Sequence, residues 1–257
     1  MNYIDTHTHI YVEEFDADRE TVIQDAVGKG VTRLLLLAID RNYHERMMSV
    51  AHNHSQNCFP MIGLHPTSVK ANYSEELNFV EKTLEKEREK FYGIGETGID
   101  LFWDNTFVNE QVQAFSRQLD LAIQYHLPVA IHTRKSLDIA LVILRQKNNP
   151  GLKGVFHCFS GTVEQAQQAI SLGFMLGIGG IITYKNSGLQ KTVKEIPLEH
   201  LLLETDAPWL PPVPHRGERN ESAYIPIIAE KIAEIKNVSL NEIAEITTKN
   251  ALTLFDL

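Results

Sequence analysis

Short apolar runs alternate with amphipathic segments along the whole chain. Each run is too short for a helix, is rich in Val, Ile, Leu or Phe, and is flanked by Gly or Pro, which is typical of a buried strand. Eight runs fit this description, at residues 3–6, 33–37, 59–63, 93–96, 128–131, 154–157, 174–178 and 201–204.

The segments between these runs have helical periodicity. Apolar residues between 112 and 123 recur at i, i+3 and i+4, which predicts a helix with one buried face. The sequences Thr-Val-Glu-Gln at 162–165 and Ser-Leu-Asn-Glu at 239–242 have the form of capping boxes. Ser74 is the expected N-cap of the segment that contains Leu77 and Val80.

Alternation of apolar strands with helices predicts a parallel α/β sheet that is covered on both faces. Eight such units in 257 residues favour a closed (β/α)₈ TIM barrel, which typically takes about 250 residues. An open, doubly wound sheet is the alternative, but it would usually carry a Gly-rich phosphate turn where this chain has His7-Thr8-His9. No repeat or change of composition marks a linker, so we expect a single domain over residues 1–257.

Composition and charge exclude several classes of protein. Hydrophobic residues make up 43% of the chain and charged residues 22%, which excludes a disordered or fibrous chain. A net charge of −9 argues against coating nucleic acid or an anionic membrane by bulk attraction. Two cysteines cannot build a disulfide framework, and no apolar run approaches the ~18 residues of a membrane span. We therefore expect a cytoplasmic protein with no membrane association and no obligate protein partner.

The chain has 11 histidines, and their positions matter more than their number. His7 and His9 stand two apart at the end of the first run, so strand alternation points both imidazoles to one face, with Asp5 below them. Alone, this pair fits a surface pair or buried structural histidines better than a site. However, further ionisable residues end the fourth, fifth, sixth and eighth runs: Glu96, His132, His157, and Glu204 with Asp206. In a barrel, these strand ends meet at one rim.

Imidazoles and carboxylates together are the ligands that divalent first-row metals accept, with no thiolate needed. His7, His9, Glu96, His132, His157 and Asp206 are too many for one tetrahedral ion that also keeps an open position. We therefore expect two ions that share a carboxylate, with Glu96 as the bridge. Strand alternation turns Cys158 away from this face, so we expect it to pack. The motifs of serine, cysteine and nucleoside triphosphate chemistry are missing from the sequence.

Six blocks of sequence resemble those of TatD-type metal-dependent deoxyribonucleases and follow the same order. They are His7-Thr8-His9, Gly63-Leu64-His65-Pro66, Gly93-Ile94-Gly95-Glu96-Thr97-Gly98-Ile99-Asp100, Pro128-Val129-Ala130-Ile131-His132-Thr133-Arg134, His157-Cys158-Phe159-Ser160-Gly161 and Leu203-Glu204-Thr205-Asp206-Ala207-Pro208-Trp209-Leu210. The resemblance extends to Asn250-Ala251 and so covers essentially the whole chain. The Gly-Glu-Thr-Gly and Glu-Thr-Asp-Ala-Pro blocks are its most specific parts.

This resemblance implies a TIM barrel of the metal-dependent hydrolase superfamily that cleaves phosphodiester bonds of DNA. It implies one ion held by His7, His9, Glu96 and Asp206, and a second held by Glu96, His132 and His157. His65 matches a position near the scissile phosphate, and Glu204 matches an acidic partner. The chain departs from the family at Ser222, where proline is common, and at 101–103 (Leu-Phe-Trp), where a tyrosine is frequent. Both departures lie on expected loops.

The expected mechanism uses two divalent ions (Mg²⁺, Mn²⁺ or Zn²⁺) that lower the pKa of a water so that hydroxide attacks phosphorus. Asp206 would act as general base with Glu204 in support. His65 and Arg134 would hold phosphate oxygens. The alternative for His65 is a histidine that only packs a loop, and the alternative for Arg134 is a structural ion pair.

The expected substrate is DNA, preferentially single-stranded and degraded from an end. Four aromatic residues near the expected mouth could stack on unpaired bases or simply pack loops: Phe102, Trp103, Tyr184 and Trp209.

Two other functions stay open at this point. A metal-dependent ester or amide hydrolase, such as an aminoacyl-tRNA deacylase, would use the same barrel, and its substrate also carries phosphates. Related two-metal amidohydrolases often bridge their ions with a carboxylated lysine at the end of the fourth strand; Glu96 stands there instead, which favours the nuclease. A binding protein with structural metal is the other alternative, although such a site would normally close tetrahedrally and a chain of this length needs no such support.

Overall fold

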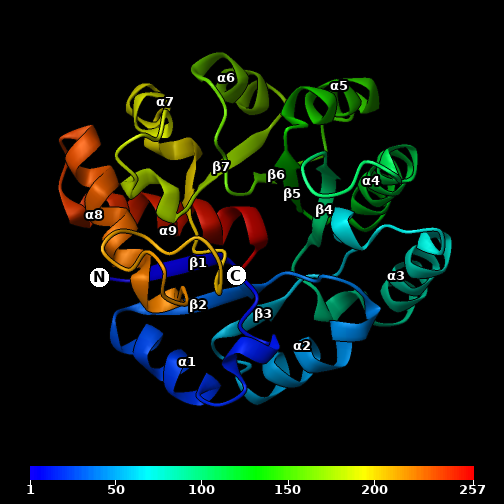
Figure 1. Ribbon diagram of the computed structural model, residues 1–257, viewed down its shortest axis with the longest axis horizontal. Coiled ribbons are helices and arrows are strands. Elements are labelled where there is room, and N and C mark those ends of the chain that lie inside the picture. The colour runs from blue at the N-terminus through cyan, green and yellow to red at the C-terminus, as the bar shows by residue number, and fades with distance from the viewer.

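Eight parallel strands form the inner wall of the molecule, and helices surround them as a ring (Figure 1). The computed structural model describes every residue from 1 to 257. The strands are Tyr3–Thr8 (β1), Val31–Leu36 (β2), Cys58–Pro60 (β3), Ile94–Asp100 (β4), Val129–Arg134 (β5), Gly154–Phe156 (β6), Phe174–Ile178 (β7) and Leu201–Leu203 (β8). Each lies on one of the eight predicted runs.

The helices alternate with the strands, and one additional helix ends the chain. They are Arg19–Gly28 (α1), Arg41–Asn53 (α2), Tyr73–Glu87 (α3), Val108–Tyr125 (α4), Leu137–Lys147 (α5), Val163–Ser171 (α6), Leu189–Glu195 (α7), Ile225–Lys236 (α8) and Leu240–Phe255 (α9). None of them is long and apolar enough to cross a membrane.

Backbone hydrogen bonds close the strands into a barrel. Strands β1 to β3 pair in chain order, and so do β4 to β8. The two groups meet on one side where Ile62, just after β3, bridges to Ile94 of β4. They meet on the other side where Thr8 bridges to Ala207, and where the Asp206 N–H donates to the His7 carbonyl at 2.9 Å. The predicted (β/α)₈ TIM barrel is confirmed, and the open, doubly wound sheet is wrong.

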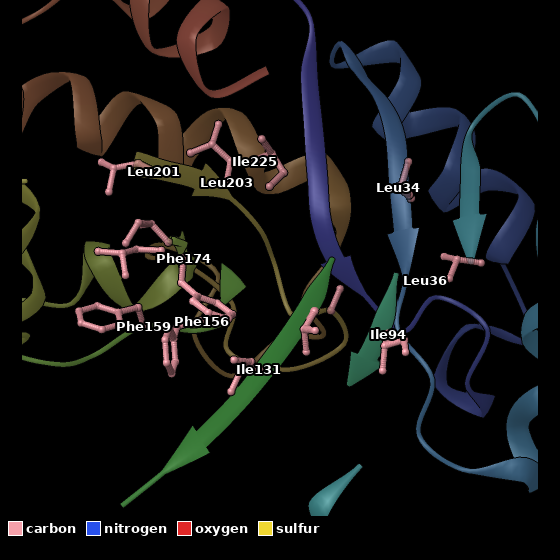
Figure 2. Close-up of a cluster of buried hydrophobic side chains, with 14 of the residues drawn as sticks. Leu34, Leu36, Ile94, Ile131, Phe156, Phe159, Phe174, Leu201, Leu203 and Ile225 are labelled. Atoms are coloured by element: carbon pink, nitrogen blue, oxygen red, sulfur yellow. The ribbon is translucent and has the colours of Figure 1, made fainter. Parts of the chain in front are cut away.

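Two layers of buried apolar side chains stabilise the barrel. The larger one lies between the strands and the surrounding helices, where Phe156, Phe159 and Phe174 pack together (Figure 2). The smaller one fills the barrel interior: Ile4, Leu35, Leu37, Met61, Ala130, Val155 and Leu202 meet Ala251, Leu254 and Phe255 of α9. Helix α9 closes the amino end of the barrel, since Asn250 donates to the carbonyls of Leu198 and Leu201 at the start of β8. Polar side chains are therefore left at the opposite, carboxyl end.

Strands β4 and β5 extend further than their apolar runs predict. Glu96 and His132 do not end these strands, because pairing continues to Asp100 and Arg134. Gly98 permits this extension: its φ is +147°, and a Cβ there would lie 2.0 Å from the His132 carbonyl oxygen. The glycine and polar residues of β4 from 96 to 100 allow the strand to continue its pairing, but they also interrupt the apolar pattern from which its length was predicted.

Of the three predicted helix caps, one is confirmed in full, one in part, and one is wrong. Thr162 and Gln165 form the predicted capping box at the start of α6. Ser239 accepts a hydrogen bond from the Glu242 N–H, which is half of the second predicted box. Ser74 is not the cap, because α3 begins at Tyr73 and Asn72 occupies the N-cap position.

The apolar plug yields a stability prediction. Phe255 is buried in the barrel interior, so Phe255→Ala should lower the free energy of unfolding by roughly 3–5 kcal/mol through lost burial and a cavity. Urea unfolding followed by circular dichroism measures this change. Thr253→Ala, on the exposed face of the same helix, is the matched control and should stay near wild type. Equal effects of the two substitutions would contradict a plug formed by α9.

Candidate metal centre

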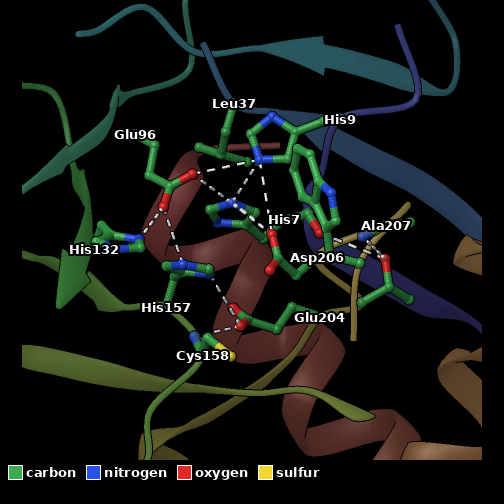
Figure 3. A network of polar contacts seen from close by, with 12 residues as sticks. His7, His9, Leu37, Glu96, His132, His157, Cys158, Glu204, Asp206 and Ala207 are labelled. Atoms are coloured by element: carbon green, nitrogen blue, oxygen red, sulfur yellow. Dashed lines mark hydrogen bonds and ion pairs between the residues drawn. The ribbon is translucent and has the colours of Figure 1, made fainter. Parts of the chain in front are cut away.

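One oxygen of Glu96 faces the first histidine pair at the carboxyl end of the barrel. Oε2 lies 3.0 Å from His7 Nε2 and 3.4 Å from His9 Nε2 (Figure 3). Asp206 approaches the same pair, with Oδ1 3.6 Å from His7 Nε2 and 3.8 Å from His9 Nε2. His7 lies on β1 and His9 directly follows it, Glu96 lies on β4, and Asp206 is in the segment after β8.

The other oxygen of Glu96 faces a different set of imidazoles. Oε1 lies 2.7 Å from His132 Nδ1, 3.0 Å from His157 Nε2 and 3.2 Å from His65 Nε2. The carboxylate therefore separates two groups of nitrogen atoms (Figure 3). His65, expected only near the substrate, lies inside this second group, and His157 also comes close to His7 and Asp206.

The clustered donors fit divalent metal ions. All of them are imidazole nitrogens or carboxylate oxygens, and no lysine or arginine lies among the ion pairs of the cluster. His7 Nε2 and His9 Nε2 lie 3.1 Å apart and both face Glu96, so these nitrogen atoms converge on one point. A group of nearly buried imidazoles that converge on a carboxylate is an arrangement that a bound metal ion would stabilise.

Burial and neighbouring charge shift the pKa values of Glu96 and Asp206 in opposite directions. Burial would raise the pKa of Glu96, but the imidazoles of His65, His157 and His7 lower it to well below its ordinary value. Burial raises the pKa of Asp206 to about 6, although His157 opposes the change. Glu96 is therefore a fixed anion, whereas Asp206 is close to taking up a proton.

In two histidines of the cluster, the ring nitrogen that does not face Glu96 contacts another side chain. His132 Nε2 lies 2.9 Å from Asp100 Oδ2, which leaves Nδ1 to face Glu96. His9 Nδ1 lies 3.1 Å from the hydroxyl of Tyr11, which donates in turn to the Leu37 carbonyl. Such partners fix the orientation of a ligating ring.

Asp100 contacts the cluster, although its sequence position alone did not mark it as a site residue. Burial would raise its pKa, but hydrogen bonds from His132 and from the Phe102 and Trp103 N–H groups lower it to about 2. A signal for Asp100 was present in the sequence. Counting by twos from Glu96 along an extended strand places Asp100 on the same face.

Glu204 lies behind His157, on the side of the ring away from Glu96. Its Oε1 is 3.4 Å from His157 Nδ1 and accepts a hydrogen bond from the Cys158 N–H. The carboxylate is fully buried. Cys158 was expected to turn away by strand alternation, but β6 ends at Phe156, and Cys158 has a left-handed backbone (φ +46°) that places its N–H on Glu204.

Asp5 does not lie beneath the histidines as predicted. The register of β1 is irregular between Asp5 and Thr8, so simple alternation fails there. Its carboxylate instead accepts hydrogen bonds from the N–H and hydroxyl of Thr205, from the Ser222 hydroxyl and from the His7 N–H. These bonds hold the segment that carries Asp206. Ser222, where the family commonly has proline, contributes its hydroxyl to this network.

Arg134 lies outside the histidine cluster, at the end of β5. Its guanidinium carbon is 3.8 Å from the ring centroid of Phe102, and Arg134 forms no ion pair. The alternative of a structural ion pair is therefore wrong. Of the other aromatic residues near the mouth, Trp209 packs edge-on against His9, and the Tyr184 hydroxyl donates to the Pro211 carbonyl.

Comparisons with known proteins identify the family of the chain. A family model described as TatD related DNase matches residues 4–256. The chain belongs to the TatD family. It is 38% identical over 252 residues to a Bacillus subtilis protein named "uncharacterized metal-dependent hydrolase YabD", and the match covers 98% of each chain. This TatD-family protein is accordingly a metal-dependent hydrolase, and its clustered His, Glu and Asp side chains are the candidate ligands of a divalent metal.

Solved structures of relatives agree with this family. The crystal structure of YjjV, a TatD homologue from Escherichia coli, matches with a TM-score of 0.94 and 32% identity over 99% of this chain and 98% of that one. A TatD family hydrolase from Entamoeba histolytica matches with a TM-score of 0.88 over 99% of this chain and 98% of that one. At 24% identity, this second likeness supports the barrel fold alone.

The place of Glu204 can be tested through a glycine beside it. A Cβ on Gly177 would lie 2.0 Å from Glu204 Oε2, so Gly177→Ala must displace this carboxylate from His157. We expect the free energy of unfolding to fall by about 1–3 kcal/mol and the affinity for Mn²⁺ to fall by about tenfold. Urea unfolding and isothermal titration calorimetry measure the two effects.

Gly179 provides the matched control for this substitution. A Cβ there would meet no atom closer than 3.6 Å, so Gly179→Ala should leave both quantities near wild type. An unchanged Mn²⁺ affinity in folded Gly177→Ala protein would mean that Glu204 does not support the cluster.

Proposed function

We propose that this TatD-family protein is a deoxyribonuclease that hydrolyses the phosphodiester bonds of DNA, acting on single strands from an end. The observation that carries the proposal is the division of the Glu96 carboxylate, with Oε2 on His7 and His9 and Oε1 on His132 and His157. A carboxylate with a separate set of nitrogen donors at each oxygen is suited to bridge two ions. Pairs of ions about 3.5–4 Å apart are typical of phosphoester hydrolysis.

We assign His7, His9, Asp206 and Glu96 to one ion, and Glu96, His132 and His157 to the other, with Mg²⁺, Mn²⁺ or Zn²⁺ as the candidates. When bound, such ions supply a water of lowered pKa and offset the negative charge of the phosphate. Glu204 keeps the His157 ring in place from behind, as Asp100 does for His132.

Asp206 is the residue we assign to accept the proton of the attacking water. Its side chain is 14% exposed, whereas those of His7 and Glu96 are 0% and 3% exposed, so Asp206 is the carboxylate of this group that a substrate can approach. The hydrogen bonds of Asp5 fix the loop on which it stands.

His65 and Arg134 are assigned to the phosphate oxygens. His65 Nδ1 lies 2.7 Å from the Thr67 hydroxyl, which orients the ring with Nε2 toward the cluster. Arg134 has no carboxylate partner, so its guanidinium donors are available to an anion. Because the chain carries a net charge of −9, attraction for DNA would be confined to this mouth and would depend on the bound metal.

The family description supports a nuclease, since the model that matches nearly the whole chain is described as TatD related DNase. Hydrolysis of another ester, such as that of an aminoacyl-tRNA, is the competing activity, because the same cluster could activate water toward a carbonyl carbon. The position of Glu96 on β4, where related two-metal amidohydrolases often have a modified lysine, favours phosphodiesters.

An end-labelled single strand tests the proposed activity. With Mg²⁺, Mn²⁺ or Zn²⁺, wild-type protein should shorten the strand progressively from one end, and EDTA should stop the reaction. His132→Ala should lower kcat/KM by roughly 100-fold or more. Loss of a residue that only orients a metal ligand already lowers activity by about 10–100-fold, and His132 is a proposed ligand itself. His52→Ala, on the exposed surface of α2, is the matched control and should keep wild-type activity.

Parallel assays on duplex DNA and on aminoacyl-tRNA separate the alternatives. Cleavage of the aminoacyl ester with no cleavage of DNA would assign the deacylase instead. Full nuclease activity of folded His132→Ala protein in EDTA would overturn the two-ion proposal.

A further inference from the structure

Two aromatic rings and two cations form an exposed ledge beside the metal centre. The ledge consists of Phe102 and Trp103, which follow β4, and Arg134 and Lys135, at and after the end of β5. Trp103 is 69% exposed and Phe102 is 44% exposed. Nothing within the chain accounts for this exposure of apolar surface.

The cations of the ledge lie against its rings and have no carboxylate partners. The Arg134 guanidinium carbon is 3.8 Å from the Phe102 centroid and 5.1 Å from that of Trp103, and Lys135 Nζ is 5.0 Å from the Phe102 centroid. Neither cation forms an ion pair, in a chain that carries nine more negative than positive charges. A ring face beside an unpaired cation matches a ligand that has both a flat π system and a negative charge.

The ledge is joined to the metal centre through a single side chain. Asp100 Oδ1 accepts hydrogen bonds from the N–H groups of Phe102 at 2.8 Å and Trp103 at 3.2 Å, while its Oδ2 lies 2.9 Å from His132 Nε2. Asp100 also pairs with Arg134 in the register of β4 and β5. A molecule that rests on the ledge is therefore held at a fixed distance from the proposed hydrolytic centre.

We propose that the ledge binds an unpaired nucleobase next to the scissile phosphate, with the exposed Trp103 ring against the base and with Arg134 and Lys135, which lie over the Phe102 ring, toward the flanking phosphates. This inference rests on the proposed nuclease function and names how a single strand is selected. Bases in a duplex are already stacked on both faces, so exposed protein rings can take only an unpaired base. A purely apolar peptide would leave the two cations without partners.

Kinetics on two single strands of equal length test this assignment: a thymidine dodecamer, and an abasic dodecamer that has the same phosphates and no bases. Base–aromatic stacking predicts that Trp103→Ala raises KM for the thymidine strand by about tenfold and leaves the abasic strand within about twofold. Trp103→Phe should restore most of the loss, because it retains a ring. Arg134→Gln should raise KM for both strands, because both carry phosphates.

Two substitutions far from the mouth serve as matched controls. Tyr92 is an aromatic residue that precedes β4, whereas Trp103 follows it, and Arg145 is an exposed arginine of α5. Tyr92→Ala and Arg145→Gln should leave KM for both strands within about twofold of wild type. Equal loss on the thymidine strand in Tyr92→Ala and Trp103→Ala would overturn the ledge as a base site.

Binding in EDTA separates failure of the ledge from failure of the proposed function. Fluorescence polarisation of labelled strands should show wild-type protein binding the thymidine strand about tenfold more tightly than the abasic strand, with Trp103→Ala losing this preference. If no strand is cleaved with any metal but this preference holds, the nuclease proposal fails and the base site stands. If cleavage is normal and the preference is missing, or Trp103→Ala changes only the sedimentation of the protein, the base site is wrong.

Discussion

The barrel must keep one carboxylate, Glu96, buried among five imidazoles. Burial of charged and polar groups is costly unless they find partners, so such a cluster depends on the groups that surround it. The chain meets this constraint by dividing the barrel interior. Apolar side chains of α9 and of the strands fill the amino end, and all of the ionisable groups gather at the carboxyl end.

Around Glu96, four of the candidate ligands have a neighbouring group that positions them. Asp100 holds His132, Tyr11 holds His9, Glu204 stands behind His157, and Asp5 holds the segment that carries Asp206. These partners lie on the barrel strands or just after them, and most of them come from a different strand than the residue they hold. The fold therefore stabilises the site and positions it with the same hydrogen bonds.

Much of this arrangement could be predicted from the sequence, because its signals are local. Eight apolar runs with helical segments between them specify the barrel, and an ionisable residue at the end of a run marks the rim. The failures arise where long-range contacts override local pattern. Pairing across Gly98 extends β4 to Asp100, and an irregular register in β1 turns Asp5 toward Thr205.

The early end of β6 and the stacking of Arg134 on Phe102 could not be predicted for the same reason. Both depend on which neighbouring segment supplies a partner, and periodicity carries no information on that. The exposure of the Trp103 ring is likewise known only from the structure. The backbone N–H of Trp103 donates to Asp100, whose other oxygen contacts His132. The proposed base site and the proposed metal site are thus connected through one carboxylate.

The most direct test of this account is anomalous diffraction from crystals of the protein soaked in Mn²⁺. The account predicts two anomalous peaks on opposite sides of the Glu96 carboxylate. One should lie against His7, His9 and Asp206, and the other against His132 and His157. A single peak, or two peaks that do not share Glu96, would contradict it.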